Sequence, residues 1–156
     1  MKKIIMIIYS LFVTVELSGF LKTEGRLIVN ENNEKVILKG FGLGGWLVLE
    51  GYMWNYPGFG STTVLENEIE ELVGLERKKL FFNTYRENYI SQKDIELMAD
   101  NGFNAIRIPL HYKHFSKNKN TFTNEGFNIL EPIISLCKKN NIYIILDMHA
   151  APGGQN

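Results

Sequence analysis

The sequence predicts a parallel α/β fold, specifically a (β/α)8 TIM barrel, and three observations lead to that expectation. Apolar, β-prone segments at 103–109 and 143–146 flank a helical segment at 124–139. This strand–helix–strand order implies parallel strands with right-handed crossovers, and its spacing fits eight such units in roughly 250 residues. Two apolar runs within 27–38 predict a β-hairpin that could cover the bottom of a barrel. A doubly wound sheet is the alternative.

Length and charge narrow the functional classes. The chain has 156 residues and a formal net charge of zero, so nothing indicates the basic patch that a nucleic-acid partner would need. The length allows one domain. However, a Pro-Gly-Gly loop signal at 152–154 stands almost at the last residue, where a complete domain would need a closing element. We therefore expect residues 19–156 to be the N-terminal part of a larger domain.

Residues 1–18 resemble an export signal. Lys2 and Lys3 form a basic start, and the apolar stretch at 4–15 is shorter than the roughly 20 residues of a transmembrane helix. A secreted or periplasmic protein without a stable membrane anchor is expected. A buried N-terminal strand or a short anchor is the alternative. Cys137 is the only cysteine, so no intrachain disulfide can form, and its apolar surroundings predict a core residue.

Two segments between the hairpin and the helices are rich in glycine or aromatic residues. Four glycines at 40–45 predict close backbone approach or positive φ rather than a regular element. A phosphate-binding loop would require a following helix and usually a lysine, and neither is present. The rings of the aromatic loop at 51–63 could stack on sugars or simply pack onto the body of the domain. The sequence leaves both alternatives open.

Helices fill most of the next stretch. Two are expected between 64 and 89, separated by Gly74. Ser91, with Asp94 three residues later, signals the start of a third helix, and Gly102 its end.

The second predicted strand should stop at Pro109, which lacks a backbone donor. Pro132 interrupts the next helical segment, so the regular helix should begin only after Asn128. His111 and His114 fall in a predicted loop without a third metal ligand, which favours solvated or sugar-contacting histidines over a metal site. The apolar stripe of this last helix would consist of Phe127, Leu130, Ile134 and Cys137.

The candidate functional residues lie where the predicted strands end. Asp147 and His149 stand at or just past the end of the strand at 143–146, which reads as buried on both faces. Arg107 lies in the preceding predicted strand, at 103–109. Glu50 follows the first strand expected after the hairpin, in the segment 40–50. In α/β architectures this edge carries the chemistry.

A buried arginine needs a partner. The natural partner of Arg107 would be a carboxylate from another strand, held ionised and oriented as a nucleophile requires. A structural ion pair with Asp147 is the alternative. His149 could donate to a substrate hydroxyl, or it could be a satisfied strand-end histidine.

Three motifs together resemble a known family. Residues 40–50 (GFGLGGWLVLE), 102–109 (GFNAIRIP) and 146–156 (LDMHAAPGGQN) are similar to the first three strand segments of glycoside hydrolase family 5. The family is cellulase-like, and the similarity points to its exo-β-1,3-glucanase branch. It extends over residues 25–156, and three motifs in order at the proper spacing make it specific.

The resemblance implies a (β/α)8 barrel that cleaves β-glycosidic bonds of polysaccharides such as β-glucan with retention. It implies that Arg107 orients the nucleophilic carboxylate, and that His149 and Glu50 hydrogen-bond the sugar whose bond breaks. No metal ion or organic cofactor is expected.

The family's two catalytic glutamates match no residue of this chain. The acid/base glutamate follows an asparagine near the end of the fourth strand, and the nucleophile ends the seventh. We therefore expect the 156 residues alone to be inactive and poorly stable, with an open sheet edge. The alternative is a non-catalytic carbohydrate-binding or vestigial chain, which would bind glycans without turnover.

Overall fold

A computed structural model describes residues 19–56 and 60–153 of the chain. The export signal predicted at 1–18 lies outside these residues, and so does Phe59 of the aromatic loop. Within the part that the structure describes, no helix has the length and apolar character needed to cross a membrane.

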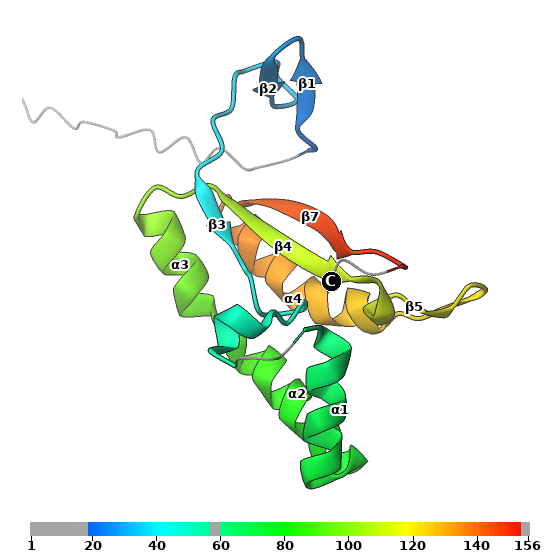
Figure 1. The fold of residues 1–156 in the computed structure, drawn as a ribbon. Helices are drawn as coiled ribbons and strands as arrows, with labels where there is room; N and C mark the ends of the chain where they lie inside the picture. The colour runs from blue at the N-terminus through cyan, green and yellow to red at the C-terminus, as the bar shows by residue number, and fades with distance from the viewer. Residues whose placement is uncertain (1–18, 57–59, 154–156) are drawn as a thin grey trace, which may run out of the picture.

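A three-stranded parallel sheet forms the centre of the molecule, with strand order β3-β4-β7 (Figure 1). Its register places Gly42 beside Arg107, and Arg107 beside Ile145. The predicted parallel α/β arrangement is confirmed. The described strands form an open sheet and not a closed barrel. The strands are β1 (Lys22–Glu24), β2 (Leu27–Val29), β3 (Gly40–Gly42), β4 (Ala105–His111), β5 (Ser116–Asn118), β6 (Thr121–Phe122) and β7 (Tyr143–Ala150).

Four α-helices and two short 3-10 helices accompany these strands in the described residues. Gly74 separates the first two α-helices as predicted, and Ser91 and Asp94 form the predicted capping box. Gly102, with a φ of +75°, follows the third helix, also as predicted. The helices are α1 (Thr62–Val73), α2 (Leu75–Tyr89), α3 (Gln92–Asp100) and α4 (Glu125–Lys139), with η1 (Gly51–Trp54) and η2 (Tyr112–His114).

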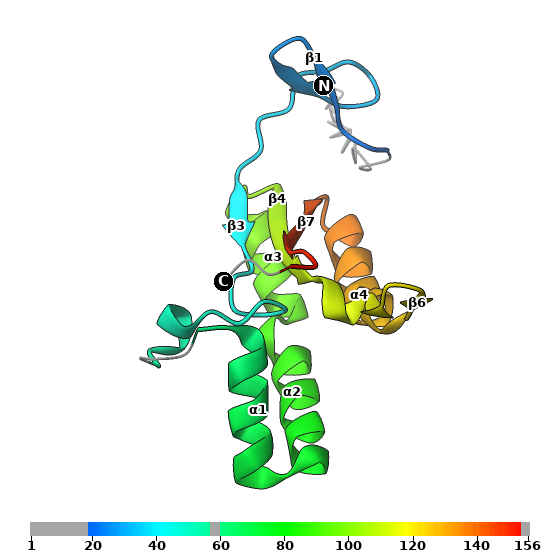
Figure 2. The same cartoon turned by 45° about the vertical axis from the view of Figure 1, so that its right-hand side comes forward.

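The two ends of the sheet carry different structures (Figures 1 and 2). The β1–β2 hairpin lies beyond the start of β3 and β4, whereas the α1–α2 hairpin extends from the opposite end. Since parallel strands point the same way, the segments after β3, β4 and β7 meet at the end near α1.

The main core lies between the sheet, α3 and α4. Ile106 and Ile108 of β4 pack with Ile95 of α3 and with Leu130 and Cys137 of α4, and all five are almost completely buried. Burial raises the pKa of the Cys137 thiol to about 12, so the thiol stays protonated. The prediction that Cys137 is a core residue is confirmed.

The N-terminal hairpin differs from the prediction. Strand β2 pairs with the preceding β1, and residues 36–38 form no strand. The Val36 amide donates one hydrogen bond to the Ile28 carbonyl (2.8 Å). The backbone that follows is hydrogen-bonded by Asn104 instead. Its side chain accepts from the Lys39 amide (2.8 Å) and donates to the Ile37 carbonyl (2.9 Å), so these groups are not available for a ladder.

Three expectations about the central strands are wrong. Pro109 lies inside β4, because the β4–β7 ladder shifts register after it and tolerates the missing donor. Residues Gly40–Gly42 form a regular strand, although the predicted close backbone approach is present at Gly40. Strand β7 is not buried on both faces, since it is the outer strand of the described sheet and exposes 43% of Ile145 and 52% of Leu146.

Helix α4 begins earlier than predicted. Asn124 precedes its first turn, so the helix runs through Asn128, with Pro132 inside it and exposed. The predicted apolar stripe is also partly wrong, because Phe127 and Ile134 are exposed. The buried face of the helix consists of Gly126, Leu130, Ile133 and Cys137.

Candidate active site at the ends of the strands

Three polar side chains from β4 and β7 meet on one face of the sheet. The Arg107 guanidinium donates to Asp147 Oδ2 through Nη2. The same Nη2 lies 3.0 Å from His149 Nδ1, which in turn lies 3.0 Å from Asp147 Oδ2. Alternation along a strand places Asp147 and His149 on the same face. The structure therefore brings the predicted residues Arg107 and His149 together, with Asp147 between them.

The cluster contains an ion pair between Arg107 and Asp147, which is the alternative that the sequence left open for the arginine. The expected burial of the arginine is only partial, since 42% of its side chain and 31% of that of Asp147 are exposed. The Nη1 atom lies 3.8 Å from the position that a Cβ of Gly42 would occupy. The guanidinium thus reaches from the β3 side to Asp147 on β7, across the middle strand that carries it.

Glu50 lies eight positions beyond the end of β3, directly before η1, and accepts a hydrogen bond from the Tyr52 hydroxyl (3.3 Å). It lines a polar cavity of about 240 Å³ that Ala150 and Ala151 also border. Because these alanines follow His149 directly in the chain, the cavity adjoins the Arg107–Asp147–His149 cluster. The three clustered side chains do not line it themselves.

Thr62, at the start of α1, positions the backbone next to Glu50. Its buried hydroxyl accepts from the Leu49 amide (3.1 Å) and lies 3.2 Å from the Leu49 carbonyl, to which it can donate. Sequence reasoning missed Thr62, since no local pattern shows that the start of α1 folds back onto residue 49. It also missed Lys113, which lines the cavity and donates through Nζ to the Thr63 hydroxyl.

The two histidines near the carboxyl end of β4, His111 and His114, are more buried than expected. His111 is the last residue of β4, and its Nδ1 accepts from the Lys113 amide (3.2 Å). Burial, together with nearby positive charge, lowers the pKa of both His111 and His114 to about 4, so both are neutral at pH 7. Of the two alternatives predicted for these histidines, the solvated one is wrong, and sugar contact stays a prediction, since His111 lines the same cavity as Glu50. Among residues 19–56 and 60–153, no group of three metal-binding side chains is assembled.

The aromatic loop divides between the two roles left open by the sequence. Trp54 packs onto α2, with its ring centre 5.2 Å from that of Tyr85 and 6.4 Å from that of Phe81. Tyr52 is 76% exposed and contacts Glu50. The Trp54 ring therefore packs the loop onto α2, whereas the rings of Tyr52 and Tyr56 are exposed.

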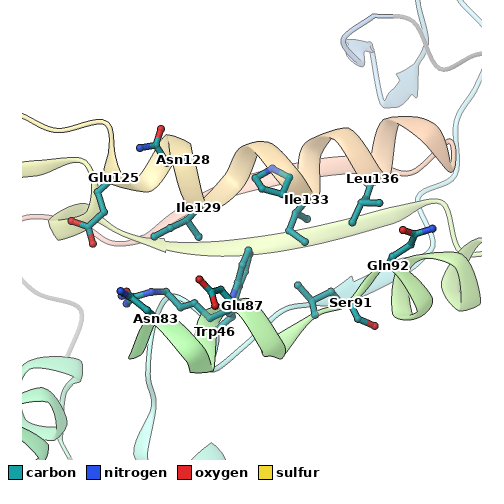
Figure 3. A pocket seen from close by; sticks show the side chains of 13 residues that line it. Trp46, Asn83, Glu87, Ser91, Gln92, Glu125, Asn128, Ile129, Ile133 and Leu136 are labelled. Atoms are coloured by element: carbon teal, nitrogen blue, oxygen red, sulfur yellow. The ribbon is translucent and has the colours of Figure 1, made fainter. Parts of the chain in front are cut away.

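A larger cavity of about 550 Å³ lies among the helices, between α4 and the α2–α3 junction (Figure 3). In Figure 3, Ile129, Ile133 and Leu136 of α4 face the α2–α3 segment, which carries Asn83 and Glu87. None of the predicted site residues borders this cavity. The strand ends therefore remain the candidate active site.

Comparisons with known proteins identify relatives of this chain. A β-xylosidase of Phanerodontia chrysosporium is 37% identical over 140 residues, which is 88% of this chain and 29% of the relative. A glucan 1,3-β-glucosidase of Blumeria graminis is 30% identical over 140 residues, 85% of this chain and 32% of the relative. The crystal structure of AoRut matches with a TM-score of 0.59 and 28% identity, over 76% of this chain and 34% of that chain.

The chain thus spans about a third of the length of these relatives. The family model described as cellulase (glycosyl hydrolase family 5) matches residues 65–156, which is more than half of the chain. The resemblance drawn from the three sequence motifs is confirmed, and the chain belongs to glycosyl hydrolase family 5.

Proposed function

We propose that this chain forms the N-terminal part of the catalytic barrel of a secreted glycosidase that hydrolyses the β-glycosidic bonds of polysaccharides, of which β-glucan is the first candidate, with retention. One observation carries the proposal. In a chain of glycosyl hydrolase family 5, Arg107, Asp147 and His149 meet on adjacent parallel strands beside the cavity that Glu50 lines. Active sites of barrel enzymes lie at this end of the strands.

In a retaining mechanism one carboxylic acid protonates the leaving oxygen, and a carboxylate about 5 Å away attacks the anomeric carbon. Arg107 would orient that attacking carboxylate. A guanidinium has five N–H donors, and contact with Asp147 and His149 occupies only Nη2. The positive charge would also favour the ionised, nucleophilic form of the carboxylate.

His149 and Glu50 would bind the sugar. His149 contacts its neighbours in the cluster through Nδ1, and its imidazole would hydrogen-bond a sugar hydroxyl. Glu50 is an acceptor on the wall of a polar cavity whose volume suits a single sugar residue, with the exposed Tyr52 ring beside it.

Neither catalytic glutamate matches a residue of this chain, so these 156 residues would supply the supporting half of the site. The proposed export route rests on residues 1–18, whose basic start and short apolar stretch are typical of a secretory signal.

The test is to express the complete gene product and to assay aryl β-glucosides, aryl β-xylosides and β-1,3-glucan. We expect hydrolysis, with the β-anomer of the released sugar appearing first by proton NMR. A first product of α configuration would contradict retention. Glycan binding without turnover would instead support a non-catalytic carbohydrate-binding protein. The isolated 156-residue chain serves as the control, and we expect no hydrolysis from it.

A further inference from the structure

We propose that Asp147 is a positioning residue for the reaction: it holds Arg107 and His149 in one arrangement on one face of the sheet, so that the guanidinium meets the nucleophile in a fixed orientation. This inference rests on the proposed function.

One carboxylate oxygen of Asp147 contacts both Arg107 and His149. Asp147 Oδ2 accepts from Arg107 Nη2 and lies 3.0 Å from His149 Nδ1. The two partners are themselves 3.0 Å apart. Three groups in mutual contact restrict one another more than any single pair does, because a rotation of one side chain breaks two contacts.

The register of the sheet shows in which direction the Arg107 side chain extends. Arg107 lies opposite Ile145, and Asp147 lies opposite Pro109, two residues further along β4. The arginine side chain must therefore lean along its strand, toward the carboxyl end, to reach Asp147. Without this carboxylate, the contact with His149 would remain to hold the long and flexible side chain in that direction.

On its opposite flank, the guanidinium has no polar anchor among the residues that the structure describes. Gly42 lies beside Nη1 and has no side chain that could hold it. Among the described residues, Asp147 is the carboxylate that forms an ion pair with Arg107. The carboxylate on β7 therefore sets the position of the guanidinium.

A merely structural ion pair would behave differently. The two side chains are 42% and 31% exposed, and ion pairs of that exposure contribute little to stability. A structural role thus predicts small changes in every property when Asp147 is replaced. A positioning role predicts a selective loss of turnover, because small misplacements of a catalytic geometry cost up to about 100-fold in rate.

The experiment uses the complete gene product with Asp147→Asn, which keeps the shape of the side chain and removes its charge. We expect kcat to fall about 10- to 100-fold, with KM within about 3-fold of its original value and an unchanged melting temperature. Glu70→Gln is the matched control, because it breaks the ion pair with Lys78 on the α1–α2 hairpin. We expect it to leave kcat unchanged. A wild-type kcat in Asp147→Asn, or an equal loss in Glu70→Gln, would overturn the inference.

A double-mutant cycle tests whether Asp147 acts through Arg107. In an Arg107→Lys background, Asp147→Asn should cause little further loss of kcat/KM. The same fold-loss in both backgrounds would refute the coupling. Should Asp147→Asn fail to fold, Asp147→Glu retains the charge but displaces the carboxylate, and the same loss of kcat is expected from it.

The two proposals fail in different ways. If the unaltered gene product hydrolyses no β-glycoside, the proposed function is wrong and this inference falls with it. If the unaltered product is active and Asp147→Asn is equally active, only the positioning role is refuted.

Discussion

Gly40 packs against the backbone of Ala105, its partner across the β3–β4 ladder, so closely that a Cβ on Gly40 would lie far less than 3.0 Å from the Ala105 carbonyl oxygen. Backbone atoms in a parallel ladder cannot move aside as the end of a side chain can. We predict that Gly40→Ala destabilises the complete gene product by about 1–3 kcal/mol or more, measured as a lower melting temperature.

Gly60 provides the control for this substitution, since a Cβ there would meet nothing within 4 Å. Gly60→Ala should change the free energy of unfolding by less than about 0.5 kcal/mol. Equal effects of the two substitutions would show that β3 does not pair with β4 at this register.

The α1–α2 hairpin is hydrogen-bonded to the glycine-rich turn that leads to Glu50. The Tyr85 hydroxyl donates to the Gly45 carbonyl (2.6 Å), and the Trp46 indole donates to the Arg86 carbonyl (3.0 Å). We predict that Tyr85→Phe costs about 0.5–1.5 kcal/mol of stability, because the Gly45 carbonyl loses its partner. It should also raise KM for a β-glycoside, since the turn positions residue 50.

Tyr143→Phe is the matched control for Tyr85→Phe, because the Tyr143 hydroxyl makes no hydrogen bond to any described residue. It should leave both the melting temperature and KM unchanged. If Tyr85→Phe also left the melting temperature and KM unchanged, the α1–α2 hairpin would not support the position of Glu50.

The parallel strands could be predicted because their signal is local. Strands β4 and β7 each begin with β-prone apolar residues, which is the local signal that predicted them. Once both are placed, topology alone brings their carboxyl ends to one edge of the sheet. The sequence did not predict the contact between Arg107 and His149, and it placed Asp147 and His149 at or past the end of a strand, whereas both lie inside β7. The family resemblance then supplied the chemical roles that spacing alone left open.

The errors arose where a distant residue decides the outcome. Residues 36–38 look like a strand, but Asn104 binds their backbone from more than sixty positions away. The contribution of Thr62 beside Glu50 depends on α1 folding back onto residue 49, which no local pattern reveals. The exposure of β7 depends on which strands lie beside it, and that is a property of the whole sheet.

The capping box at the start of α3 should be visible in the acid stability of the protein. Hydrogen bonds from the Ser91 side chain and backbone hold the pKa of Asp94 below its ordinary value of 3.8. A carboxylate with a lowered pKa contributes stability above its unfolded pKa, and this contribution is lost as the pH falls through the folded value. Ser91→Ala should therefore cost about 1 kcal/mol at pH 7 and a smaller amount below pH 3.

The measurement is urea denaturation of the complete gene product at several pH values. Ser135→Ala, on the exposed side of α4, is the control and should have little effect at any pH. A cost that is independent of pH would mean that Ser91 caps the helix without influencing the Asp94 carboxylate.

His114 should make the fold sensitive to mild acid. Burial lowers its pKa from 6.5 to about 4, and the positive charges of Arg86 and Lys113 add to this effect. A bond to the Leu47 backbone acts in the opposite direction, and Glu125 Oε1 lies 3.9 Å from Nδ1. The unfolded chain therefore takes up a proton near pH 6.5 that the folded protein does not bind until about pH 4.

Because the unfolded chain binds this proton at a higher pH than the folded protein, the free energy of unfolding falls as the pH is lowered. The contribution of neutral His114 is fully present above pH 6.5 and is lost as the pH falls toward 4, by up to about 1.4 kcal/mol per pH unit. His111 behaves in the same way. We predict that His114→Gln lowers the slope of the unfolding free energy against pH between about pH 5 and 6.5, measured by urea denaturation, and that adding His111→Gln lowers it further. An unchanged slope in His114→Gln would mean that His114 is already charged, and hence exposed to water, in the folded protein.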